Sequence, residues 1–129
     1  MSEKILTMKL LKEEYGVCRL DNAEEIPEWA KNSDFFSITK TGEELSIVCA
    51  EESIPSGIKC ERHWKILKIQ GPLDFSLVGI LASISSILAQ NKISIFAIST
   101  YDTDYILVKN KDIENAIACL ANERYEILV

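Results

Sequence analysis

The sequence has one histidine, no CxxC pair of cysteines and no long uninterrupted apolar run. Because His63 is the only histidine, a metal cluster built on several histidines and a two-histidine mechanism are both excluded. No stretch approaches the roughly 18 apolar residues of a transmembrane helix. The phosphate-binding glycine patterns, the P-loop and GxGxxG, are also missing. We therefore expect no metal, no cofactor and no membrane span.

Positive charge is also scarce. The 129 residues carry 14 Lys and Arg against 20 Asp and Glu, which gives a net charge of −6. An acidic surface repels phosphate backbones and anionic lipids, so nucleic acid and membrane are not expected as partners. The hydrophobic content of 47% is enough for a core without disulfide or metal staples. The length fits one compact domain, or two very small ones.

Four scattered cysteines carry no metal or disulfide spacing: Cys18, Cys49, Cys60 and Cys119. The first nine residues alternate polar and apolar side chains and lack the apolar core of a secretory signal. Secreted disulfide frameworks are cysteine-dense and follow such a signal. We therefore expect a cytoplasmic protein whose thiols are reduced and pack as small hydrophobes.

The first half, residues 1–58, reads as a shortened ββαββ arrangement. Alternation over 6–10 is typical of a half-buried strand, which a turn at 13–16 would join to a second strand in a hairpin. The remaining expected elements are a short helix starting at Pro27 and strands over 35–39 and 45–50, joined at Thr41-Gly42. The loop signal at 53–57 places the boundary between residues 58 and 59.

The second half, residues 59–129, predicts the order βαββαβ. The expected elements are a strand over 64–69, a helix from Asp74 or Phe75 to Gln90, strands over 93–98 and 105–109, a helix from Asp112, and a strand over 125–129. This is the α+β, ferredoxin-like plan, an antiparallel sheet with helices on one face.

Two polar segments suggest a binding site. The turn over 71–76 enters a helix, whose free backbone N–H groups accept a carboxylate or phosphate; the alternative is a tight turn with Asp74 as an ordinary N-cap. The cluster over 99–105 includes Asp102 and Asp104, which could hold an ammonium group; the alternative is a hairpin turn that caps its own backbone. The expected fold brings both segments together, a charge layout that suits a free amino acid.

The expected long helix has a face of small residues: Gly79, Ala82, Ser83 and Ser86. No charged residue occurs from Phe75 to Asn91, whereas an exposed helix face normally carries several. We expect this face to be covered by a neighbouring chain or to border a ligand; the alternative is a solvated helix surface.

Residues 71–82 and 93–108 together resemble an ACT domain, of the type found in the cytosolic arginine sensors of the CASTOR family and in short stand-alone bacterial proteins. The resemblance is strongest over 64–129 and implies an amino-acid-binding regulatory module, with ligand held between ACT units. It implies these ligand-binding positions: Gly71, Asp74, Phe75, Ser76, Ile98, Ser99, Thr100, Tyr101 and Asp104. Leu77 stands where the arginine sensors are expected to carry an acidic residue that meets the guanidinium. The expected ligand is therefore a smaller or more apolar amino acid than arginine.

The leading hypothesis is a non-catalytic amino-acid sensor that acts as a homodimer on a regulated protein partner. A dimer would reproduce by symmetry the larger set of ACT units that the arginine sensors hold in one chain. One alternative is a structural or protein-interaction module of ACT fold with no working ligand site. A small enzyme is the other, for which no candidate triad is present in the sequence.

Overall fold

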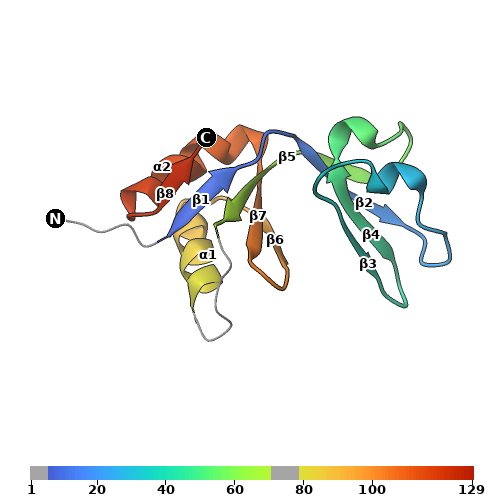
Figure 1. The fold of residues 1–129 in the computed structure, drawn as a ribbon, viewed down its shortest axis with the longest axis horizontal. Helices are drawn as coiled ribbons and strands as arrows, with labels where there is room; N and C mark the ends of the chain where they lie inside the picture. Colours follow the sequence, from blue (N-terminus) through green and yellow to red (C-terminus); the bar gives the residue numbers. More distant parts are fainter. Residues whose placement is uncertain (1–5, 71–78) are drawn as a thin grey trace. The chain divides into compact units, whose positions relative to one another are not determined.

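The computed structural model describes residues 6–70 and 79–129 of the chain (Figure 1). The chain divides into two compact units. The C-terminal unit combines Met1–Lys12 with Lys65–Val129, and the N-terminal unit is Glu13–Trp64. The division expected from sequence put all of residues 1–58 in one half, whereas the first strand groups with the C-terminal unit.

The C-terminal unit follows the predicted βαββαβ order, preceded by an additional strand. Its elements are β1 (Thr7–Leu10), the end of β5 (Cys60–Ile69), α1 (Ile80–Gln90), β6 (Ile95–Ser99), β7 (Asp104–Lys109), α2 (Ile113–Asn122) and β8 (Glu126–Leu128). The order from β5 to β8 confirms the ferredoxin-like α+β fold. Within the described ranges, neither helix is long and apolar enough to cross a bilayer.

Strand β1 lies between β5 and β8, so the sheet order in this unit is β6-β7-β5-β1-β8. Met8 pairs antiparallel with Ile69 of β5 and parallel with Ile127 of β8. The sheet is therefore mixed and not purely antiparallel. The predicted hairpin between β1 and the next strand is wrong: two neighbours already satisfy the backbone of β1, and Met8 becomes fully buried.

Both helices of the C-terminal unit pack on one face of this sheet and contact each other. The inward residues alternate along the strands, as a pleated sheet requires. The core consists of Met8, Leu67, Ile69, Ile84, Leu88, Ile93, Ile106, Val108, Ile113, Ala116, Leu120 and Tyr125. The buried residues of α1 and α2 in this core are three or four positions apart, as residues on one face of a helix are.

Helix α1 begins at Ile80, later than the predicted start at Asp74 or Phe75. Gly79 is the N-cap residue and adopts a left-handed φ of 79°, which a continuing right-handed helix does not allow. The small residues Ala82, Ser83 and Ser86 are exposed in the single chain.

The N-terminal unit is a sheet of order β3-β4-β2-β5 with its own core. Its elements are β2 (Tyr15–Leu20), a 3-10 helix (Glu28–Lys31), β3 (Ser37–Lys40), β4 (Leu45–Ala50), a second 3-10 helix (Glu51–Ser53) and the beginning of β5. The antiparallel β3–β4 pair confirms the hairpin predicted around Thr41-Gly42. The core residues are Cys18, Ala30, Leu45, Ile47, Cys49 and Ile54, which gives two of the four cysteines the expected packing role.

Candidate ligand-binding site

The polar cluster predicted from sequence forms the turn between β6 and β7. Ser99 and Asp104 are the last pair of the ladder. The backbone N–H of Thr100 donates to the carbonyl oxygen of Thr103 over 2.8 Å. The Thr100 hydroxyl donates to the same carbonyl over 3.0 Å, and its oxygen accepts from the Thr103 N–H over 3.3 Å. The side chain of Thr100 therefore shapes the turn.

Thr103 attaches this turn to the end of β5. Its hydroxyl donates a 2.7 Å hydrogen bond to the carbonyl oxygen of Ile69, the last residue of that strand. The Thr103 side chain is buried, with 4% of the residue exposed. In the sequence Thr103 is one member of the polar cluster without a separate role, because nothing local distinguishes a threonine that bonds a distant carbonyl from one that caps its own turn.

Four of the nine predicted site residues lie outside the described residues: Gly71, Asp74, Phe75 and Ser76. Leu77 also lies outside them. Helix α1 has Gly79 as its N-cap, without a side-chain cap hydrogen bond, so the predicted capping of this helix by Asp74 is wrong.

The other predicted residues lie together on the β6–β7 hairpin. Ser99, Thr100 and Tyr101 are exposed, and Ile98 and Asp104 are partly buried. The Tyr101 residue is 81% exposed, which is unusual for a large aromatic residue. Ile98 lies opposite Tyr105 in the ladder. The turn thus presents a carboxylate, hydroxyl groups and an aromatic ring, which can accept hydrogen bonds from an ammonium group and cover an apolar side chain.

Clear pKa shifts occur in the N-terminal unit. Burial raises the pKa of the Cys49 thiol to about 11. Burial, with a smaller contribution from the negative charges of Glu13 and Asp34, raises the pKa of Tyr15 to about 12. The pKa of Cys18 is raised still further by burial and by its 3.4 Å hydrogen bond to the Cys60 sulfur. At neutral pH Cys18 and Cys49 are protonated thiols with little nucleophilic character.

Two family models match the chain. The model for the ACT domain matches residues 59–122, and one described as an N-terminal domain matches residues 13–57. The human "Cytosolic arginine sensor for mTORC1 subunit 1" is 31% identical over 100 residues, and its bovine counterpart is 32% identical. These alignments cover 69% of this chain and only 30% of the sensors, so the chain spans less than a third of the length of these relatives.

Solved structures share the fold over nearly the whole chain. Protein Atu0741 from Agrobacterium tumefaciens is 40% identical, with a TM-score of 0.91, and the match covers 98% of this chain and 94% of that one. The aspartokinase alpha and beta subunits are 16% identical with a TM-score of 0.66, covering 90% and 95% of the two chains, which shows the fold alone. Together with the βαββαβ unit described above, these matches establish that the chain belongs to the ACT domain family.

Proposed function

We propose that this chain is a regulatory protein that senses a free amino acid as a dimer, without catalysis. The observation that carries the proposal is the Thr103–Ile69 hydrogen bond. It holds the polar turn 99–104 beside the end of the strand that leads into residues 71–76. The Asp104 carboxylate would then accept hydrogen bonds from the ligand's ammonium group, and backbone N–H groups of residues 71–76, which precede α1 in the sequence, would bind its carboxylate.

The ligand is a smaller or more apolar amino acid than arginine. The curated relatives are named as arginine sensors. This chain has Leu77 where the resemblance implies an acidic residue facing the guanidinium. A leucine offers no compensating charge, and burying an unpaired guanidinium is costly.

A second copy of the chain would add to the sensor. Two-fold symmetry would supply further ACT units from the same sequence. The exposed small face of α1, at Ala82, Ser83 and Ser86, allows close approach of another backbone. The dimer would act in the cytoplasm on a regulated protein partner.

Thermal unfolding in the presence of each of the twenty amino acids tests the ligand. A ligand that binds the folded state raises the melting temperature by mass action. We expect a rise with at least one small or apolar amino acid and a weaker rise with arginine. Asp104→Asn should remove the rise, whereas Asp102→Asn, a matched change at an exposed neighbour, should keep it. No rise with any amino acid at millimolar concentration would contradict the proposal.

The second candidate is an interaction module of ACT fold without a working ligand site. It is favoured by the exposed uncharged face of α1. Light scattering coupled to size exclusion measures the mass in solution, and Ser86→Glu introduces a charge into the small face. A dimer that Ser86→Glu dissociates supports the sensor. A monomer that no amino acid stabilises favours docking to a different protein.

A further inference from the structure

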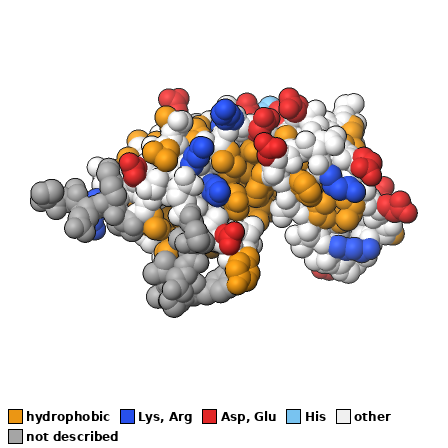
Figure 2. Space-filling model, in the orientation of Figure 1, with side chains coloured by type: hydrophobic (Ala, Val, Ile, Leu, Met, Phe, Trp, Pro, Cys, Tyr) orange, Lys and Arg blue, Asp and Glu red, His pale blue; other side chains and the backbone are white. Residues whose placement is uncertain are grey.

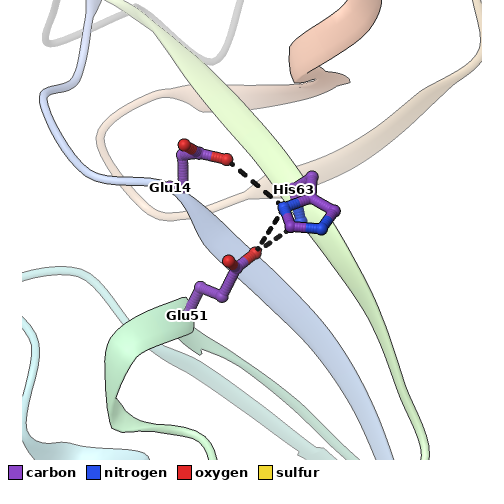
Figure 3. A group of neighbouring side chains, drawn as sticks. All are labelled: Glu14, Glu51 and His63. Atoms are coloured by element: carbon purple, nitrogen blue, oxygen red, sulfur yellow. Dashed lines mark hydrogen bonds and ion pairs between the residues drawn. The ribbon is translucent and has the colours of Figure 1, made fainter.

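Three metal-ligating side chains converge in the N-terminal unit (Figure 3). Glu14 immediately precedes β2, Glu51 opens the 3-10 helix that follows β4, and His63 lies in β5. They come from three separate segments, so their spacing in the sequence gave no signal. The expectation of no metal rested on the single histidine, which excludes only sites that need several histidines. We propose that Glu14, Glu51 and His63 bind a divalent transition-metal ion of the zinc class.

The separation of the donor atoms fits such an ion. The Nδ1 atom of His63 lies 3.3 Å from Oε1 of Glu51 and 3.6 Å from Oε1 of Glu14. One donor atom from each residue lies within 4.8 Å of both others. Two ligands that each bind zinc at about 2.0–2.1 Å with a tetrahedral angle are about 3.3–3.4 Å apart. An ion therefore needs only small side-chain adjustments.

The backbone orients two of the ligands toward each other. His63 adopts a left-handed φ of 69°, which is uncommon for a residue with a Cβ atom. Its N–H donates a 2.6 Å hydrogen bond to Oε1 of Glu51. An ionised carboxylate has about four lone-pair sites, so Glu51 can keep this bond and still bind a metal. The bond thus provides the outer hydrogen bond that orients a metal-ligating carboxylate.

Charge and exposure define the kind of ion. Two carboxylates and a neutral imidazole carry two negative charges, which a divalent cation neutralises. An imidazole nitrogen favours zinc, nickel or copper over magnesium and calcium. The side chains of His63, Glu14 and Glu51 are 69%, 41% and 22% exposed, and in Figure 2 the pale blue histidine lies at the surface beside red carboxylates. Three protein ligands on an open surface leave at least one position for water or an external ligand.

Proton NMR spectroscopy can report zinc binding at His63 directly. Because His63 is the only histidine, the full chain gives one pair of imidazole C–H signals. Titration with zinc chloride should shift both signals and saturate at one equivalent, while calcium chloride should leave them unchanged. Ring signals that do not respond to excess zinc would overturn the proposal, even if calorimetry detected zinc at the thiols. Such a result would leave the three side chains in contact with one another without a bound ion.

Variants assign the other ligands by calorimetry. Glu51→Gln and Glu14→Gln should each weaken zinc binding by more than about tenfold. Substitution of a residue that only hydrogen-bonds to a metal ligand already lowers metal affinity by about that factor. His63→Asn should do the same, and asparagine tolerates the left-handed φ. Glu52→Gln is the matched control, because it removes an equal charge from the exposed neighbouring residue, and it should bind zinc as the parent chain does. Equal affinity in all four variants would refute the site.

Discussion

The hydroxyl group of Thr103 donates a 2.7 Å hydrogen bond to the backbone carbonyl oxygen of Ile69. The two residues are 34 positions apart in the chain, and both are buried. The bond joins the β6–β7 turn, which carries half of the proposed ligand site, to the strand end that leads into the other half. The stability of the site should therefore depend on a residue with no proposed ligand contact.

Replacing Thr103 by valine should destabilise the chain. Thr103→Val keeps the shape of the side chain but leaves the buried carbonyl of Ile69 without this donor, which costs about 1–3 kcal/mol. Urea unfolding followed by circular dichroism measures the loss. Thr103→Ser retains the hydroxyl and should lose less. A Thr103→Val chain as stable as the parent would show that the carbonyl finds another donor.

Gly16 should not tolerate a side chain. A Cβ atom there would collide with the end of the Ile54 side chain and lie 2.8 Å from the Cys60 sulfur. Overpacking of this kind costs about 1–3 kcal/mol, so Gly16→Ala should lower the urea midpoint. Gly42→Ala is the control, because in the part of the chain that the structure describes no atom lies within 4 Å of its added Cβ. Equal midpoints for the two variants would contradict the close packing at Gly16.

A glycine should be required at position 79 because of its backbone conformation, and not because a side chain would collide with a neighbour. An added Cβ meets no atom of the described residues within 4 Å, but the φ of 79° is left-handed. An L side chain there costs about 1–2 kcal/mol, and asparagine adopts this conformation more readily than alanine. Thermal unfolding should rank the variants as parent, then Gly79→Asn, then Gly79→Ala. The reverse order of the two variants would mean that α1 begins differently.

Alkaline pH should destabilise the N-terminal unit through Cys49. Burial raises the pKa of this thiol from 9.0 to about 11, so the unfolded chain ionises first as the pH rises. The stabilisation is complete below pH 9 and is lost between pH 9 and about 11. Urea midpoints at pH 8 and pH 10.5 should differ more for the parent chain than for Cys49→Ala. The same pH dependence in both would assign the effect to other groups, Tyr15 among them.

The elements of the C-terminal unit were predictable because their signals are local. The spacing of Ile84 and Leu88 in one helix, and of Ile113, Ala116 and Leu120 in the other, is set by the helical repeat. The start of α1 was predicted several residues too early. A glycine such as Gly79 is compatible with a helix interior and with a left-handed cap, and the sequence alone does not determine which φ it adopts.

Pairing between distant segments was less predictable. The sequence indicated a strand at β1 but also a hairpin with β2, since adjacent strands often pair. The burial of Met8 between β5 and β8 outweighs that tendency. The cluster of Glu14, Glu51 and His63 was missed for the same reason, because no spacing in the sequence relates its three segments.

The sequence by itself determined the family, the βαββαβ order and the two polar segments of the proposed amino-acid site. The scarcity of histidine and of positive charge also excluded whole classes of site, because composition limits chemistry before any folding. Only the tertiary structure decided that β1 enters the C-terminal sheet, that Thr103 anchors the β6–β7 turn and that the one histidine meets two glutamates. These contacts join residues far apart in the chain, and they form because burial and hydrogen-bond satisfaction are decided by the whole fold and not by neighbouring residues.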